Sequence, residues 1–378
     1  MLAFGSNECL QLGLGDEITE RKKPGVVQAF AGHNVVDIAC GGIHNAAVTA
    51  DGRVWTWGCN DEKALGREFE QGQEWQPAPV GGLLAGQRVV QVVCGDSHTT
   101  VLTADGQCYN WGTYRDLAGI LGFSSGVDKQ VLPAHIAELG AHCVVQIECG
   151  ENTDMALTST GDVFEWGNTR IAAAVPARHK LGRLAPSRVL FPRGAKIARL
   201  FAGTATNFAL TTGGDVYAWG LNNFSQTGLD RADVGEKIAR PVLVPALSQC
   251  GVRDIAAGLF HTLALVGAGA DARVLSCGSG IYGQLGHGNK NETTAFGEVA
   301  ALTGKNIASV ACGTQHSLAV TAAGRVYAWG FGEMLQLGNG VEQDELVPTL
   351  VEGQQLETRI VLKADAGGQH TVFLAEQK

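Results

Sequence analysis

Hydrophobic residues along the chain come in short runs separated by polar turns, and the runs repeat. Residues 35–40 (VVDIAC), 44–49 (HNAAVT) and 53–58 (RVWTWG) are rich in Val, Ala and Trp, and Gly or Asp separates them. Short runs of this kind between turn residues predict β-strands. A further run follows a proline, as in Pro79-Val80 and 241–244 (PVLV). Proline cannot donate to a sheet ladder, so this run predicts an outer edge strand.

The unit recurs at nearly constant spacing. A second marker, Trp-Gly, closes the third run of most copies, and a Leu-Gly pair follows at 64–66 (ALG), 120–122 (ILG), 284–286 (QLG) and 336–338 (QLG). The repeat glycines stand at 41, 95, 150, 203, 258, 313 and 367, in steps of 53 to 55 residues. Four short strands in each unit of this length predict one blade of a β-propeller.

The two ends of the chain are complementary halves of one unit. Residues 359–378 stop before the Trp-Gly strand, and residues 2–13 supply Phe4-Gly5 and a Leu-Gly pair. Joining the halves would close the ring and remove open sheet edges. We therefore predict an all-β fold, a seven-bladed β-propeller of four-stranded blades. It forms a single domain over residues 1–378, with six full repeats and a seventh blade made from 359–378 and 1–16.

Composition supports a folded chain without metals or cofactors. It is 45% hydrophobic and 17% charged, which suits a large core, and it has no apolar run long enough to predict a membrane span or a membrane partner. Among its ten cysteines, four directly precede a repeat glycine where other copies have Ala, which indicates a small packing position. With no CxxC pair, no zinc site is predicted, and the compartment is expected to be reducing. The four cysteines that precede a repeat glycine are Cys40, Cys94, Cys149 and Cys312.

Histidine occupies the fourth repeat position in most copies. Threonine takes its place at Thr153 and Thr206. We predict that each ring bonds the backbone of its own blade. A shared metal ion is not expected, because equivalent positions on different blades lie too far apart. The histidines are His44, His98, His261, His316 and His370.

Several stretches outside the repeat resemble the regulator-of-chromosome-condensation family, and within it the exchange factors for the small GTPase Ran. They include 11–24 (QLGLGDEITERKKP), 58–68 (GCNDEKALGRE), 115–122 (RDLAGILG) and 367–374 (GGQHTVFL), and the resemblance covers the whole chain. It implies a guanine nucleotide exchange factor, a regulator that makes and breaks no bond of its own. The implied partners are a Ran-type GTPase with its nucleotide and Mg²⁺, and core histones or the nucleosome. A monomer in the nucleus, associated with chromatin, is expected.

Two other functions are compatible with a propeller. One is a scaffold for protein–protein interaction that exchanges no nucleotide. The other is an enzyme with a site in the central channel, but the sequence contains no Ser-His-Asp set, phosphate loop or metal cluster that would support it.

The resemblance also implies a GTPase-binding face. Asn152 and Phe260 stand where the exchange factors usually have Asp and His, which predicts slow exchange. Asp96 could instead stabilise its own turn as an Asp-Ser pair. The implied face comprises Glu8, His44, Asp96, Arg115, Asn152, Phe260, His261 and His370.

The resemblance also implies a segment that acts on the nucleotide of the GTPase. Residues 122–133 would form a protruding wedge against the nucleotide pocket, with an ordinary loop as the alternative. The wedge residues are Ser124, Ser125, Gly126, Val127, Asp128, Lys129 and Gln130.

Charge is distributed unevenly. Residues 167–199 hold eight Lys or Arg and no acid, so with a net charge of −9 the remaining chain carries −17. A cationic segment on an acidic body predicts an acidic partner, and the acidic body argues against wrapping duplex DNA. The resemblance names Arg178, Lys180 and Arg183 as candidate nucleosome contacts, with a solvated basic loop as the alternative.

Overall fold

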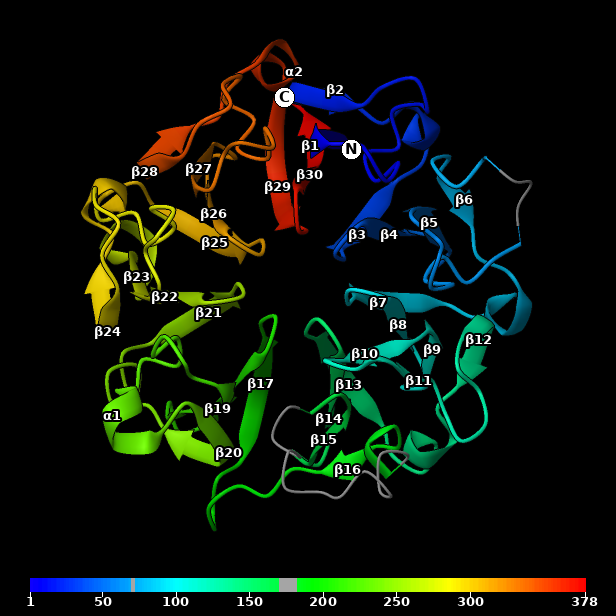
Figure 1. The fold of residues 1–378 in the computed structure, drawn as a ribbon, viewed down its shortest axis with the longest axis horizontal. Coiled ribbons are helices and arrows are strands. Elements are labelled where there is room, and N and C mark those ends of the chain that lie inside the picture. Colours follow the sequence, from blue (N-terminus) through cyan, green and yellow to red (C-terminus); the bar gives the residue numbers. More distant parts are fainter. Residues whose placement is uncertain (69–71, 170–181) are drawn as a thin grey trace.

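Antiparallel β-sheets arranged in a ring make up the molecule (Figure 1). The computed structural model describes residues 1–68, 72–169 and 182–378. The described residues form seven four-stranded sheets around a central channel, so the predicted all-β, seven-bladed propeller is confirmed. Within each blade the first strand of the unit lies innermost. The outer strand contains a proline in five of the seven blades, which agrees with the prediction there.

Each blade uses its strands in chain order from the channel outward, apart from a small insertion in blade 2 and the split in blade 7. Blade 1 contains β3 (Val35–Cys40), β4 (His44–Thr49), β5 (Val54–Gly58) and β6 (Ala78–Pro79). Blade 2 contains β7 (Val89–Cys94), β8 (His98–Thr103), β9 (Cys108–Gly112) and β12 (Gln130–His135); blade 3, β13 (Val144–Cys149), β14 (Thr153–Thr158), β15 (Val163–Gly167) and β16 (Ser187–Arg188). Blade 4 contains β17 (Ile197–Ala202), β18 (Thr206–Thr211), β19 (Val216–Leu221) and β20 (Lys237–Leu243); blade 5, β21 (Val252–Ala257), β22 (His261–Val266), β23 (Arg273–Gly278) and β24 (Thr293–Glu298). Blade 6 contains β25 (Ile307–Cys312), β26 (His316–Thr321), β27 (Val326–Gly330) and β28 (Glu345–Leu350).

Blade 7 joins the two ends of the chain. Its sheet runs β29 (Arg359–Ala366), β30 (His370–Gln377), β1 (Leu2–Ser6) and β2 (Glu20–Val26). β1 pairs antiparallel with β30, with Leu2 opposite Phe373 and Gly5 opposite His370. The N-terminal contribution runs to Val26, beyond the predicted boundary at residue 16, because β2 is needed as the outer strand. We call the β1–β30 pairing the seam.

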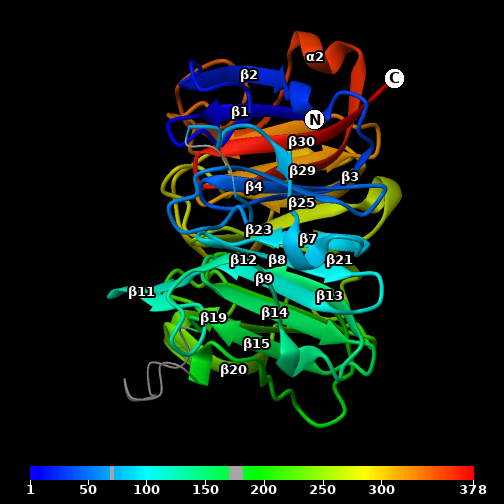
Figure 2. The same cartoon turned by 90° about the vertical axis from the view of Figure 1, so that its right-hand side faces the viewer.

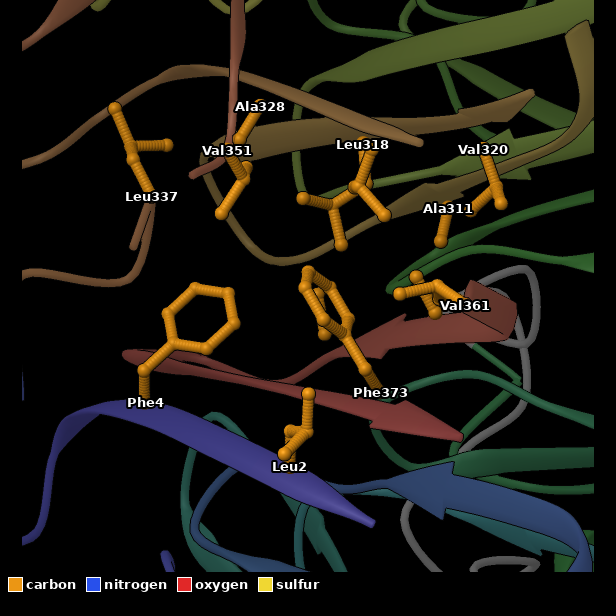
Figure 3. Close-up of a cluster of buried hydrophobic side chains, with 13 residues drawn as sticks. Leu2, Phe4, Ala311, Leu318, Val320, Ala328, Leu337, Val351, Val361 and Phe373 are labelled. Carbon is orange, nitrogen blue, oxygen red and sulfur yellow. The ribbon is translucent and has the colours of Figure 1, made fainter. Parts of the chain in front are cut away.

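The seam is filled by apolar side chains from blades 6 and 7 (Figure 3). The rings of Phe4 and Phe373 meet edge to face at a centroid distance of 5.0 Å. Leu2, Leu318 and Val351 pack in the same buried cluster. Closure therefore rests on side-chain packing as well as on backbone pairing.

The repeat histidines connect neighbouring blades, so the prediction that each bonds its own blade's backbone is wrong. The ring rests on the repeat glycine of its own blade: a Cβ on Gly95 would lie 2.1 Å from Cε1 of His98. Nε2 therefore reaches a polar side chain in the second strand of the next blade. The pairs are His44–Thr99 at 2.9 Å, His261–Ser317 at 2.9 Å, His316–Thr371 at 3.0 Å and His370–Asn45 at 2.7 Å. Burial lowers the pKa of each of these four histidines to about 3, so the rings are neutral.

No helix among the described residues is long and apolar enough to span a membrane. The short helices α1 (Arg231–Val234) and α2 (Gln354–Glu357) lie in connections between strands.

Candidate partner-binding face

One end of the ring gathers most of the predicted site residues. The turns between first and second strands open on this end, and so do the loops that leave the third strands. Asp96, Asn152 and Phe260 lie in such turns, whereas Glu8 and Arg115 lie in such loops. We call this end the loop face.

Three of the predicted face residues do not reach its surface. The side chains of His44, His261 and His370 are at most 1% exposed. They are held between blades, so a partner docked on the loop face would not touch them. They support the turns that form the face, and a role for them in binding the GTPase stays a prediction.

A two-stranded ribbon projects from blade 2 at the loop face. It consists of β10 (Tyr114–Asp116) and β11 (Gly119–Gly122), and Figure 2 shows β11 extending beyond the blades. Leu117, at the tip, is fully exposed. We call residues 114–122 the ribbon.

The ribbon lies one segment before the predicted wedge. Ser124 and Val127 form a short bridge, and Gln130 begins β12, so residues 124–130 lead back into the blade. The segment that projects is thus 114–122 and not the predicted 124–130, and a role of either segment as an exchange wedge stays a prediction. Among the described residues of blade 2, 114–122 form a two-stranded ladder separate from the four-stranded sheet.

An ion-pair cluster ties the base of the ribbon to blade 1. Glu62, in the loop after β5, pairs with Arg115, and Lys129 Nζ lies 2.7 Å from Glu62 Oε2. Lys129 Nζ also donates to the carbonyl oxygen of Asp61 at 2.9 Å. Two predicted residues, Arg115 and Lys129, thus converge on Glu62, a residue the sequence did not single out.

Blade 3 holds the ribbon from the other side. The backbone N–H of Arg115 donates to Oδ1 of Asn152 at 2.7 Å. Nδ2 of Asn168 donates to the Arg115 carbonyl oxygen at 2.9 Å. Asn152 is only 6% exposed, so this residue positions the ribbon and offers little surface to a partner.

Asp96 lies next to this cluster, half-buried on the loop face. Burial raises the pKa of its carboxyl group, opposed by the nearby His98 and Arg115. Its Oδ1 lies 2.0 Å from where a Cβ on Gly42 would be, so glycine there leaves room for the carboxylate. The arrangement is compatible both with a partner contact and with the Asp-Ser turn.

Phe260 lies across the face from the ribbon. Its ring packs against Phe224, which lies in the loop after β19, at a centroid distance of 4.7 Å. The loop face therefore has an aromatic pair where the resemblance implied a histidine.

The described residues contain one group with metal-ligand geometry. His98, Cys149 and Asp154 place their ligand atoms within 4.8 Å of one another. Cys149 occupies the small packing position seen in other blades, and burial raises the pKa of its thiol well above the usual range. The pairing of His98 with Asp154 also matches the histidine bridges of other blades. We therefore interpret the group as part of the blade frame.

The central channel has a volume of about 790 Å³. Carboxylates of Asp37, Glu148 and Asp365 line it, and Lys363 Nζ lies 2.6 Å from Asp37 Oδ1. Burial raises the pKa of Glu148 to about 7. The charged groups brace adjacent inner strands, since Lys363 also donates to the carbonyl oxygen of Ile38.

The basic segment is only partly visible. Arg178 and Lys180 lie outside the described residues, and Arg183 is half-buried. Two other cations of the segment are engaged within the propeller: Arg188 pairs with Asp162, and Arg199 donates to the carbonyl oxygen of Arg253.

Comparisons with known proteins agree with this architecture. Protein pim1 of Schizosaccharomyces pombe is 36% identical over 98% of this chain and 73% of its own length. The human protein named Regulator of chromosome condensation is 34% identical over all of this chain and 91% of its own. The plant Ultraviolet-B receptor UVR8 of Arabidopsis thaliana is also similar, with 30% identity over 97% of this chain and 79% of its own.

A solved structure matches the whole ring. Prp20p from Saccharomyces cerevisiae, described together with its binding to Gsp1p and histones, superposes with a TM-score of 0.91 at 29% identity. The match covers all of this chain and 91% of that protein. The RCC1-like domain family matches residues 1–373. This chain therefore belongs to the family of RCC1-like domains.

Proposed function

We propose that this protein is a guanine nucleotide exchange factor for a Ran-type small GTPase. The observation that carries the proposal is the braced ribbon on the loop face, in a chain that resembles chromosome-condensation regulators throughout. Glu62 and Asn152 hold Arg115 from two sides. The ribbon is therefore held in a fixed position, unlike a flexible loop. A fixed projection can displace a partner's nucleotide-binding elements without losing entropy on docking.

The mechanism is differential binding. Nanomolar to picomolar nucleotide affinity corresponds to about 12–16 kcal/mol. An exchange factor offsets part of this by binding the nucleotide-free GTPase more tightly than the loaded form. The exposed Leu117 tip would enter the nucleotide pocket region, and Asp96 and Glu8 would attract the cationic groups that hold phosphates. The released GTPase then takes up whichever nucleotide is abundant.

We extend the proposal to chromatin. Prp20p is described with histones, and this chain has a cationic segment, residues 167–199. The resemblance implies that its cations Arg178, Lys180 and Arg183 would contact an acidic surface of the nucleosome. A nuclear, chromatin-associated protein that loads a Ran-type GTPase would follow from both interactions.

The test measures release of fluorescent GDP from Ran. Leu117→Ser should lower the release rate at least tenfold, because the tip loses its apolar side chain. Leu83→Ser is the matched control: Leu83 is 60% exposed and lies in a connection that opens on the opposite end of the ring. Equal rates for the parent and both variants would refute the role of the ribbon.

A scaffold without exchange activity is the second candidate. UVR8 shows that relatives include a protein named for a different function. Asn152 and Phe260 also replace residues that the exchange factors usually carry. Tight binding of Ran by the parent protein, without acceleration of GDP release, would favour the scaffold.

A further inference from the structure

The repeat frame anchors its loops in one recurring way. At three of the seven blade boundaries a carbonyl oxygen of the loop after the third strand turns inward and accepts two hydrogen bonds from the next blade. One donor is a tryptophan indole and the other is the polar side chain that meets the repeat histidine. The carbonyl of Ala64 accepts from Trp111 at 2.6 Å and from Thr99 at 2.9 Å; that of Gln284 accepts from Trp329 and from Ser317, both at 2.8 Å.

Between blades 2 and 3 a side chain replaces this carbonyl. The indole Nε1 of Trp166 donates to the phenol oxygen of Tyr114 at 2.8 Å. The Tyr114 hydroxyl in turn donates to Oδ2 of Asp154 at 2.5 Å, and His98 Nε2 lies 3.0 Å from the same oxygen. Asp154 thus occupies the place that Thr99 has in the blade before. All of these side chains are at most 1% exposed.

Tyr114 is also the first residue of the ribbon. In blades 1 and 5 the backbone of the loop turns back to the core to present its carbonyl. Here the phenol reaches the core, so the backbone that follows can leave the blade and project. Nδ2 of Asn110 donates to the same phenol oxygen at 3.0 Å, so three groups fix its position.

We infer that Tyr114 is a positioning residue for nucleotide exchange: its buried phenol, held by Asp154 and Trp166, sets the position of the ribbon. The inference rests on the proposed exchange function. Asn152 and Asn168 hold the ribbon backbone at Arg115, and Tyr114 holds the adjacent residue from inside the core. Loss of the hydroxyl would leave the buried Trp166 indole and Asn110 amide without their acceptor, which favours displacement of the segment.

The test pairs a structural readout with a kinetic one. In Tyr114→Phe, the amides of residues 113–123 should exchange hydrogen at least tenfold faster. The kcat for GDP release from Ran should fall about tenfold, with KM unchanged, because docking surfaces outside the ribbon remain. Ser317→Ala removes an equally buried inter-blade hydroxyl on the far side of the ring and should change neither readout.

Two substitutions of Asp154 keep the inference testable if Tyr114→Phe fails to fold. Asp154→Asn keeps an acceptor for the phenol, as Asn45 does for His370, and should preserve ribbon protection and kcat. Asp154→Leu removes the acceptor and should lose both. Normal amide protection in Tyr114→Phe and Asp154→Leu would overturn the inference, and so would lost protection with unchanged kcat. If the parent releases no nucleotide, the proposed exchange function fails, and the amide data alone decide whether Tyr114 fixes the ribbon.

Discussion

Ring closure can be tested at Phe4. Its ring is fully buried in the seam and meets Phe373 edge to face. It takes the place that tryptophan has in other blades: a Cβ on Gly338 would lie 2.5 Å from the Phe4 ring, as one on Gly66 would from Trp111. Phe4→Ala removes this ring from a site with packed walls. Such substitutions cost about 3–5 kcal/mol in the free energy of unfolding.

The melting temperature follows from the size of the cooperative unit. Unfolding entropy is about 2.1 cal/mol/K per residue, which gives roughly 0.8 kcal/mol/K if all 378 residues unfold together. Phe4→Ala should then lower the melting temperature by about 4–6 °C. Calorimetry measures this shift directly.

Trp329→Ala provides the control, because Trp329 is fully buried at the equivalent position of blade 6. It should lower the melting temperature at least as much, since more apolar surface is lost. Only Phe4→Ala should preferentially accelerate hydrogen exchange in β1 and β30, where closure is not covalent. An unchanged melt for Phe4→Ala, or equal opening of the seam in both variants, would show that the closure reasoning is wrong.

Three further predictions follow from the frame and the face. Gly95→Ala should cost about 1–3 kcal/mol in chemical denaturation because its Cβ would meet His98, whereas Gly81→Ala, with open space around it, should stay within about 0.5 kcal/mol of the parent. Burial raises the pKa of Glu165 to about 7, so the folded protein favours the protonated carboxyl group. The free energy of unfolding is therefore unaffected by this group below its unfolded pKa and decreases as the pH rises toward 7. Glu165→Gln should therefore melt progressively higher than the parent between pH 5 and pH 8, and a constant difference would contradict the shift. Asn152→Asp supplies a charged acceptor under the ribbon. If this lowers the barrier to GDP release by about 1.4 kcal/mol, the release rate rises tenfold. A parent protein that already releases GDP as fast as the variant would refute this prediction.

The ring was predictable because its signal is local and repeated. The four strands of a blade can be recognised within about 54 consecutive residues, and the half-units at the two ends need only be joined. The histidine bridges were not predictable in the same way. The partner of His44 is Thr99, 55 positions away, and nothing in one repeat shows that the ring turns toward the next blade.

The ribbon escaped prediction because a frame motif occurs in a different environment. Residues 120–122 (ILG) read like the Leu-Gly pair of other loops, in which Leu65 is fully buried and Gly66 lies on an indole. Ile120, at the position of the buried Ala64, is instead 45% exposed on β11, and Leu121, at the position of Leu65, is only half-buried. The available signal was the joint appearance of Tyr114 and Asp154, two departures from the repeat that only the structure brings together.

The blade frame anchors the loop after the third strand in two ways, by a backbone carbonyl or by a side chain. In blade 1 the loop after the third strand returns the Ala64 carbonyl to the core, whereas in blade 2 the Tyr114 phenol takes that place. At the next boundary after the ribbon, the side chain equivalent to Asp154 is Asn207, and its Nδ2 donates to Oε1 of Glu165 at 3.0 Å. A buried side chain again stands in for the loop carbonyl, and the basic segment 167–199 follows that strand directly. The Tyr114 and Glu165 side chains thus take over the anchoring role next to the places where the ribbon and the segment 167–199 begin, and the resemblance implied that segments in these two regions touch partners.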